Sequence, residues 1–404
     1  MVGAKFIMLQ TAQAMDRLGT ETAFEVLARA KSLEAQGRSI INLGIGQPDF
    51  QTPPHIVEAA VKALRDGHHG YTPANGIPEL RAAVAADLAA RHGVEVDPGQ
   101  VMIVPGGKVT MFFAIMTFGE TGAEILYPNP GFPIYESVIA YSGATPVAVP
   151  LEEKDGFAFS AQAVLSRLTE RSRLLILNSP ANPTGGVTPK AEIDRLVEGL
   201  EAFPQVAVLS DEIYSRMLYG GRRHTTLLGY ESLRDRVILL DGWSKTYAMT
   251  GWRLGFGVWP RDLVEKANRL SVNCHSCVNA AAQYAGIAAL TGPQDEVERM
   301  VAAFDQRRQV VMDEIAAIPG LSCVEPAGAF YAFPNIRTTG FSAKQLEAGL
   351  LEDAGVATVA GTSFGRHGEG FIRLSYANSV ENIRAALGRV GDWLAAQKVD
   401  SGAA

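Results

Sequence analysis

Seven short apolar runs divide the middle of the chain, between about residues 100 and 260. Each run is bounded by polar or turn-forming residues, and most contain several of Val, Ile and Leu. Near-continuous apolar runs of this length are typical of strands that are buried on both faces of a sheet. The predicted strands are 100–104, 123–127, 145–149, 173–178, 205–210, 236–241 and 254–259.

Amphipathic stretches lie between several of these runs, for example at residues 188–203. Strands that alternate with helices predict an α/β fold, in which helices cover both faces of a mostly parallel sheet of seven strands. In such sheets ligands bind at the carboxyl ends of the strands, so we look for functional residues there.

The pattern changes after residue 292, where a long charged helix is predicted over 293–318. Four short apolar segments follow this helix, at 321–326, 328–334, 355–361 and 371–377, and they indicate a smaller α+β domain. We expect a turn at 291–294 to join the two parts and a helix at 22–37 to pack with the second. The predicted domains are 51–292 for the large one, and 1–50 with 293–404 for the small one.

The composition excludes several classes of protein. The chain has 404 residues, of which 47% are hydrophobic and 20% charged, as in ordinary soluble globular proteins. A net charge of -7 without basic runs argues against nucleic acid or an anionic membrane as a partner. Residues 1–19 lack a signal-peptide pattern, and no uncharged apolar stretch is long enough to span a membrane. We expect a cytoplasmic protein.

The chain contains three cysteines, too few and too scattered for a disulfide framework. Cys274 and Cys277 form a C-x-x-C pair, which suits a redox pair or half of a metal site. Because no second such pair and no paired histidines accompany it, we favour small buried side chains and expect no metal site.

Polar side chains follow three successive predicted strands at the points where these strands end. Asn182 comes after 173–178, Asp211 directly after 205–210, and Lys245 shortly after 236–241. If the strands are neighbours, an amide, a carboxylate and an amine converge on one crevice. Tyr214, three residues beyond Asp211, can reach the same place.

Phosphate-binding groups lie close to Lys245 in the sequence. Ser244 and Arg253 supply a hydroxyl and a guanidinium, and Gly106 and Gly107 form a turn that opens onto a predicted helix. An amine at a dry strand end suits a Schiff base, and a nearby aspartate keeps a pyridine nitrogen protonated. Together these groups suit an anionic cofactor that carries a reactive aldehyde.

The stretch "SKTYAMTGWRLGF" (244–256) resembles the lysine motif of class I aminotransferases, which are fold type I enzymes that depend on pyridoxal phosphate. Further motifs resemble this family in the same order along nearly the whole chain. They are "NLGIGQPDF", "GYTPANGIPELRAAV", "PGGK", "YPNPGFPIYESV", "NSPANPTGG", "SDEIYSRMLY", "PAGAFYAF" and "FIRLSYA".

The resemblance implies a role for each matching residue. Lys245 would be the Schiff-base lysine and proton shuttle, Asp211 would pair with the pyridinium nitrogen, and Tyr214 and Asn182 would bind the ring 3-oxygen. Phosphate contacts would come from Ser244, Arg253, Gly106, Gly107 and Lys108, and from Tyr71 of a neighbouring subunit, which implies a homodimer with shared sites. Phe132 would stack on the ring. Arg373 would bind the substrate α-carboxylate, with Gly46 and Asn182 beside it.

The implied reaction is reversible transfer of an amino group between an L-amino acid and a 2-oxo acid, with ping-pong kinetics. Three alternatives stay open at this point: aspartate or glutamate as donor through Lys108, an aromatic or neutral donor, and β-elimination by the same cofactor. A regulator that senses an effector behind a DNA-binding module is disfavoured, because the roughly 45 residues before "GQPDF" contain no basic recognition helix.

Three stretches differ from the usual family pattern, and each could affect the choice of amino acid. They are Val109–Phe113, Arg216, and the segment "SVNCHSCVNAAAQ" that contains Cys274 and Cys277.

Overall fold

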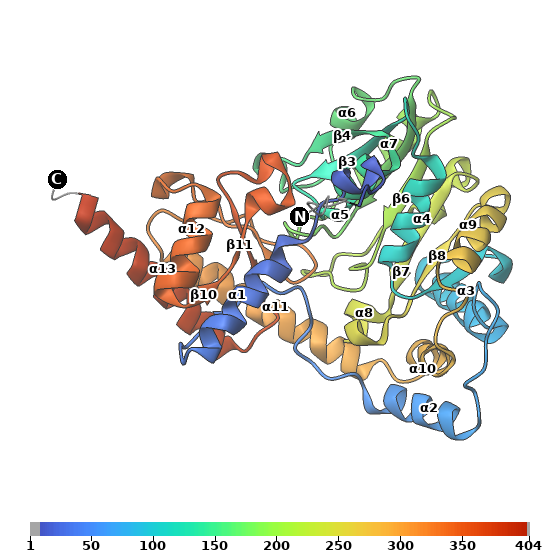
Figure 1. The fold of residues 1–404 in the computed structure, drawn as a ribbon, viewed down its shortest axis with the longest axis horizontal. Coiled ribbons are helices and arrows are strands. Elements are labelled where there is room, and N and C mark those ends of the chain that lie inside the picture. The colour runs from blue at the N-terminus through green and yellow to red at the C-terminus, as the bar shows by residue number, and fades with distance from the viewer. Residues whose placement is uncertain (1–8, 402–404) are drawn as a thin grey trace, which may run out of the picture.

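The computed structural model describes residues 9–401, with side chains up to residue 397. A seven-stranded sheet with helices on both faces forms the larger part, and a part with short strands lies beside it (Figure 1). In their order across the sheet, the strands are β2 (Val101–Val104), β8 (Gly255–Val258), β7 (Val237–Gly242), β6 (Ala207–Asp211), β5 (Ser172–Asn178), β3 (Glu124–Asn129) and β4 (Thr145–Pro150).

All seven predicted strands are confirmed, with ends shifted by at most two residues. Only β8 runs opposite to the others, since it pairs antiparallel with both β2 and β7. The remaining pairs are parallel, so the carboxyl ends of β5, β6 and β7 meet at one edge of the sheet.

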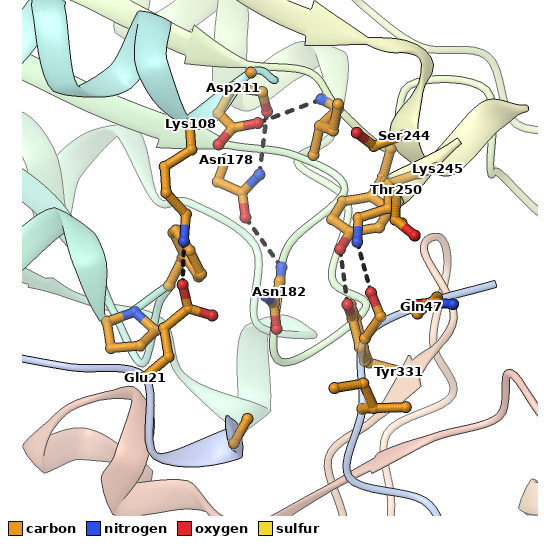
Figure 2. Close-up of a pocket in the computed structure, with 18 of the residues that line it drawn as sticks. Glu21, Gln47, Lys108, Asn178, Asn182, Asp211, Ser244, Lys245, Thr250 and Tyr331 are labelled. Carbon is orange, nitrogen blue, oxygen red and sulfur yellow. Dashed lines mark hydrogen bonds and ion pairs between the residues drawn. The ribbon is translucent and has the colours of Figure 1, made fainter. Parts of the chain in front are cut away.

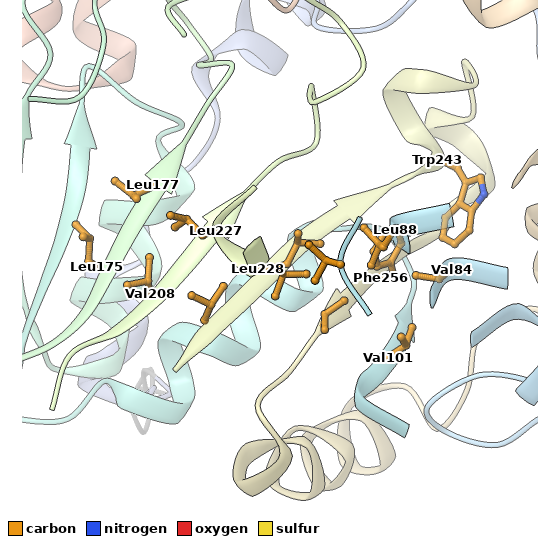
Figure 3. Packing of buried hydrophobic residues seen from close by; sticks show 14 of the residues in the cluster. Val84, Leu88, Val101, Leu175, Leu177, Val208, Leu227, Leu228, Trp243 and Phe256 are labelled. Atoms are coloured by element: carbon orange, nitrogen blue, oxygen red, sulfur yellow. The ribbon is translucent and has the colours of Figure 1, made fainter. Parts of the chain in front are cut away.

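The sheet is buried on both faces because its strands are apolar at almost every position. In β5, Leu175 and Leu177 belong to the hydrophobic cluster on one face, and Leu174 and Ile176 belong to the cluster on the other. Figure 3 shows part of the first cluster, where Leu175 and Leu177 pack near Val208 of β6. Burial of each such side chain stabilises the fold by about 1.5–3 kcal/mol.

Helices cover each face. On the face of the first cluster lie α2 (Pro54–Arg65), α3 (Pro78–His92), α6 (Ala161–Leu165), α7 (Lys190–Leu200) and α10 (Ala280–Thr291). On the other face lie α4 (Lys108–Phe118), α5 (Ile134–Ser142) and α9 (Arg261–Cys274). α3 shows how local sequence sets the bounds: it begins with Pro78 at a position where no backbone N–H is needed, and it ends before Gly93 in the left-handed conformation.

The smaller part combines short strands with long helices. It contains α1 (Thr22–Ala35), β1 (Ile41–Asn42), α11 (Asp295–Ala316), β9 (Tyr331–Ala332), α12 (Ala343–Gly349), the π-helical turn η8 (Leu350–Ala354), β10 (Val356–Ala357), β11 (Val359–Ala360), β12 (Ile372–Ser375) and α13 (Val380–Ser401). Strands form in three of the four predicted apolar segments. The exception is 321–326, where Ser322 makes only an isolated bridge to Asn335.

The N-terminal helix packs as expected with the C-terminal elements. Val26, Ala30 and Leu33 of α1 form a buried cluster with Leu351 and Ala357. The short helix before it, η1 (Gln13–Arg17), instead lies against α5 of the larger part. The chain thus crosses from one part to the other before residue 22, and the domain boundaries at residues 50 and 292 stay a prediction.

The expectation for the cysteine pair is wrong. Cys274 is the last residue of α9 and is exposed, and Cys277 is half-buried in the loop before α10, because the amphipathic helix turns this end toward solvent. Among the helices formed by residues 9–401, none combines the length and the apolar character needed to cross a membrane.

Candidate active site

A cavity of about 530 Å³ lies at the carboxyl ends of the sheet strands, between the larger and the smaller part. Its walls include eleven of the residues predicted from the sequence: Gly46, Gly107, Lys108, Phe132, Asn182, Asp211, Tyr214, Ser244, Lys245, Arg253 and Arg373. Figure 2 shows how Asp211, Ser244 and Lys245 reach it from the ends of neighbouring strands, while Glu21 lies just before α1 and Gln47 lies after β1.

Asp211, the last residue of β6, places a buried carboxylate in the cavity. The Tyr135 hydroxyl donates a hydrogen bond to its Oδ2 at 2.6 Å, and the Ile213 backbone N–H donates to its Oδ1 at 3.3 Å. Burial nevertheless raises the pKa of Asp211 to about 6, because these two donors replace only part of its hydration. A cation placed beside this carboxylate would stabilise its charged form.

Lys245 lies in α8 (Trp243–Thr246), a single helical turn that directly follows β7. Its ammonium donates a hydrogen bond to the Gly46 carbonyl oxygen at 2.6 Å. Burial, and after it the positive charge of Arg373, lower the pKa of Lys245 to about 8. A lysine with a lowered pKa supplies more neutral amine near neutral pH, which is the nucleophilic form.

Arg373 of β12 is a buried guanidinium, with only 3% of the residue exposed. Its Nη1 donates to Asn182 Oδ1 at 2.9 Å, and its Nη2 donates to the Gly44 carbonyl oxygen. Its Nε has no hydrogen-bond partner among the described residues. Because a buried N–H without a partner is costly, this guanidinium is suited to a further acceptor such as a carboxylate.

The residues predicted to bind a phosphate lie together, with the Arg253 guanidinium next to the backbone turn at Gly106 and Gly107. Gly106 has φ +96°, and a Cβ there would collide with the Arg253 guanidinium, so only glycine lets the two approach. Arg253 itself has φ +53°, a strained conformation for a residue with a side chain. Its Nη1 donates to the Thr250 carbonyl oxygen at 2.8 Å, which holds the guanidinium over the turn at Gly106 and Gly107.

The two predicted tyrosines differ from each other in their placement. Tyr214 is buried, and its hydroxyl shares a hydrogen bond of 2.8 Å with the hydroxyl of Tyr331. Tyr71 is 94% exposed and does not line the cavity of its own chain.

Lys108, the first residue of α4, forms an ion pair with Glu21, which precedes α1 (Figure 2). Its ammonium also lies 5.2 Å from the centre of the Phe132 ring. Lys108 was predicted from the sequence as a site residue, but Glu21 was not, because no local spacing relates residues that are 87 positions apart.

Tyr135, Asn178 and Tyr331 were also missed. Asn178 is the last residue of β5 and pairs directly with Asp211, so its place at a strand end was a usable signal. Its Nδ2 donates to the Asp211 carbonyl oxygen at 3.1 Å, and its Oδ1 accepts from the Asn182 backbone N–H at 3.0 Å. It thereby ties the loop of Asn182 to the floor of the cavity.

Of the three stretches that depart from the family pattern, only the first reaches the cavity. Met111 in Val109–Phe113 lines it. Arg216 instead donates to the Tyr247 hydroxyl at 2.8 Å and to Gln294 Oε1 at 2.9 Å, outside the cavity, and Cys274 and Cys277 do not line it.

The sheet order, the flanking helices and a lysine one turn beyond the strand β7 define a fold type I enzyme. Residues 38–390 match the family described as aminotransferase class I and II. The chain belongs to this family and is an aminotransferase, as the motifs predicted.

Known relatives support this assignment. Aspartate aminotransferase of Geobacillus stearothermophilus is 35% identical, over 96% of this chain and 100% of that protein. Aromatic-amino-acid aminotransferase 2 of Thermococcus litoralis is 37% identical, over 90% and 94%. The crystal structure of the aspartate aminotransferase from Rhizobium meliloti has a TM-score of 0.92 at 32% identity, covering 96% of this chain and 99% of that one. An alanine aminotransferase from Pyrococcus furiosus has a TM-score of 0.89 at 30% identity, with 96% and 100% covered.

Proposed function

We propose that amino transfer takes place in this cavity, with pyridoxal phosphate as cofactor and with an L-α-amino acid and a 2-oxo acid as substrates. The observation that carries the proposal is that a buried carboxylate, Asp211, and an amine of lowered pKa, Lys245, line one cavity at the ends of adjacent strands.

The residues present fit this cofactor. When bound, pyridoxal phosphate supplies an aldehyde that condenses with amines and a ring that accepts the electrons released at the substrate Cα. Arg253, Ser244 and the backbone at Gly106, Gly107 and Lys108 would hold its phosphate, and Phe132 would lie against its ring. The Arg253 guanidinium lies close to Gly106, at the turn that leads into the N-terminus of α4, and a guanidinium beside a helix N-terminus suits an anion.

Lys245 is the group that would bind the cofactor covalently and move the proton. Its amine is held at the Gly46 carbonyl oxygen, in the stretch of chain that follows β1. Because its pKa is lowered to about 8, this amine can both give and accept a proton near neutral pH.

Asp211 would stabilise positive charge on the heterocyclic nitrogen. Tyr135 holds this carboxylate in place by its hydrogen bond of 2.6 Å, and burial keeps competing water away. Tyr214 and Asn182 line the same cavity and would bind the oxygen on the ring. Asn182 is already held by Arg373 and by Asn178, so its orientation does not depend on a ligand.

Arg373 would bind the α-carboxylate of the substrate through two parallel hydrogen bonds. Its Nε has no hydrogen-bond partner among the described residues and so favours an anion in this place. The rings of Tyr331 and Phe364, whose centres lie 4.6 and 4.7 Å from its guanidinium carbon, stabilise the positive charge. Gly46 would add backbone contacts, and it must be glycine because a Cβ would collide with the Tyr331 hydroxyl.

A homodimer with shared sites completes the proposal. A tyrosine that is 94% exposed is unusual, and Tyr71 would become useful if it reached the phosphate site of a second subunit. The cytoplasmic location and the absence of a nucleic-acid partner stay predictions.

The test is a spectroscopic titration of the apoprotein with pyridoxal phosphate. We expect a new visible absorbance band, which each true amino acid donor then removes, with release of the matching 2-oxo acid. Lys245→Ala should show no such band and only negligible turnover. Lys266→Ala, which removes an exposed lysine of α9 outside the cavity, should behave as the wild type. A Lys245→Ala protein that kept normal turnover would refute the assignment. Release of pyruvate and ammonia without a 2-oxo acid acceptor would indicate β-elimination instead.

A further inference from the structure

One ion pair on the cavity wall has no role in the proposed chemistry. Glu21 and Lys108 both line the cavity and pair with each other (Figure 2). The Glu21 side chain is 17% exposed and the Lys108 side chain is 45% exposed, so the Glu21 side chain is the more buried of the two.

Contacts between the N-terminal segment and α5 hold Glu21 in this position. Arg17 Nε donates to the Ala140 carbonyl oxygen at 2.7 Å, and the Gly19 backbone N–H donates to Ser137 Oγ at 2.8 Å. On the other side of Glu21, helix α1 begins at once and packs on the smaller part. The carboxylate is therefore brought to Lys108 by anchors on both sides of it along the chain.

Lys108 is the remaining cation of the cavity. Among the described residues that line it, the cationic side chains are Lys108, Lys245, Arg253 and Arg373. The proposed function uses the last three for the cofactor and the α-carboxylate. Among the cations of this chain, a second carboxylate on a substrate would therefore have to pair with Lys108, which already forms an ion pair with Glu21.

The surroundings of the pair are largely apolar. Phe24, Ile45, Met111, Phe132 and Phe364 line the same cavity. A neutral apolar or aromatic side chain can lie against these walls while the ion pair stays closed. A dicarboxylate must either displace Glu21 or place a second negative charge beside it, and both cost free energy.

We propose that Glu21 is a specificity-determining residue: by occupying Lys108, it makes this aminotransferase select amino acids with neutral apolar or aromatic side chains over dicarboxylic ones. This inference rests on the proposed function of the cavity and names the substrate class for it.

The first experiment measures donor half-reactions of the holoenzyme, so that the choice of acceptor plays no part. Single turnovers with phenylalanine and with aspartate are followed by the loss of cofactor absorbance. We expect the wild type to favour phenylalanine. In Glu21→Gln the aspartate-to-phenylalanine ratio of rate constants should rise about tenfold, a change of about 1.4 kcal/mol. The matched control is Glu25→Gln, which removes the same charge one turn further along α1 from an exposed side chain outside the cavity, and it should leave the ratio unchanged.

The second experiment measures binding without turnover. Calorimetric titration of the holoenzyme with maleate should show about tenfold tighter binding to Glu21→Gln than to the wild type. The double variant Glu21→Gln with Lys108→Met should lose this gain, because the dicarboxylate then has no cation to pair with. Hydrocinnamate, a monocarboxylate with an aromatic ring, should bind the wild type and Glu21→Gln alike. Glu21→Ala serves as a second variant if Glu21→Gln does not fold.

The outcomes separate the two proposals. A wild type that prefers aspartate, or a Glu21→Gln variant whose ratio stays unchanged or falls, overturns the role of Glu21 while amino transfer in the cavity still stands. A holoenzyme in which neither donor nor any other amino acid changes the cofactor absorbance overturns the proposed function, and the inference with it.

Discussion

The carboxyl ends of β5, β6 and β7 and the segment that leads into α1 border the same cavity, but different interactions hold them. Asn178 and Asp211 sit in a parallel ladder with direct register, between two layers of buried side chains. Residues 13–21 are held by a few hydrogen bonds to α5, of which those of Arg17 are exposed. The carboxyl ends of these central strands are rigid because many cooperative hydrogen bonds would have to break together. The N-terminal segment depends instead on a few separate contacts.

This difference separates the two tasks of the site. Lys245 and Asp211, the groups proposed for the chemistry, lie at the rigid carboxyl ends of β7 and β6. Rigidity matters for these two groups because a misplacement of about 1 Å is costly to catalysis. The group proposed for substrate choice, Glu21, stands on the N-terminal segment. Substitutions in that segment can change which amino acid is accepted while the catalytic groups keep their geometry, and the predictions below test this separation.

The largest effect is expected at Lys245. Lys245→Ala removes the amine that would transfer the proton, and general acid–base groups contribute up to about 10⁴-fold. We expect kcat to fall by about that factor in steady-state assays. External methylamine should restore part of the rate, and an unchanged kcat would place the chemistry elsewhere.

Asp211→Asn is expected to have the second largest effect. The amide keeps the size of the side chain but loses the charge that would stabilise the protonated ring, so kcat should fall about 10²–10³-fold. Thermal unfolding of the apoprotein should be affected little, because burial already disfavours the charged carboxylate. A loss of unfolding temperature without a loss of kcat would indicate a structural role instead.

The pH dependence of cofactor capture tests the environment of Lys245. Its pKa is lowered to about 8, and only the unprotonated amine reacts with an aldehyde. The rate of binding of pyridoxal phosphate to the apoprotein should therefore be constant well above pH 8 and fall as the pH drops below it. At pH 6 it should be about 10²-fold lower, as a single titration requires. Stopped-flow absorbance measures this rate, and a midpoint near 10 would contradict the burial of the amine.

Arg373→Ala is expected to act on substrate affinity. Loss of hydrogen bonds between charged groups costs about 1.5–3 kcal/mol, so KM for the amino acid should rise about 10–100-fold. The dissociation constant of the cofactor should change far less. Parallel losses in both constants would mean that Arg373 supports the fold of the cavity and does not select the substrate.

The smallest effect is expected from Arg17→Ala, which loosens the N-terminal segment. Its guanidinium donates to the Ala140 and Tyr141 carbonyl oxygens in exposed bonds, worth about 1 kcal/mol together. The aspartate-to-phenylalanine ratio should move in the same direction as in Glu21→Gln, by about two- to fivefold, while kcat for saturating phenylalanine is retained. If kcat fell as much as in Asp211→Asn, the separation between the two regions would be wrong.

The sequence alone determined the sheet and most of its functional edge. The seven strands were predictable because each is a local apolar run, and Asp211 and Lys245 because each stands where such a run ends. The order of motifs along the chain identified the family. These are properties that neighbouring residues encode, since burial on both faces and the end of a strand leave a mark within a few positions.

Only the tertiary structure decided which groups meet from distant parts of the chain. The hydrogen bond from Tyr135 to Asp211 joins residues 76 positions apart, and the pair of Glu21 with Lys108 joins residues 87 apart. The exposure of Cys274, which the sequence pattern placed inside, follows from how α9 is turned on the sheet. Such contacts arise when helices and segments dock, and docking depends on the shapes of whole surfaces, which no local spacing records.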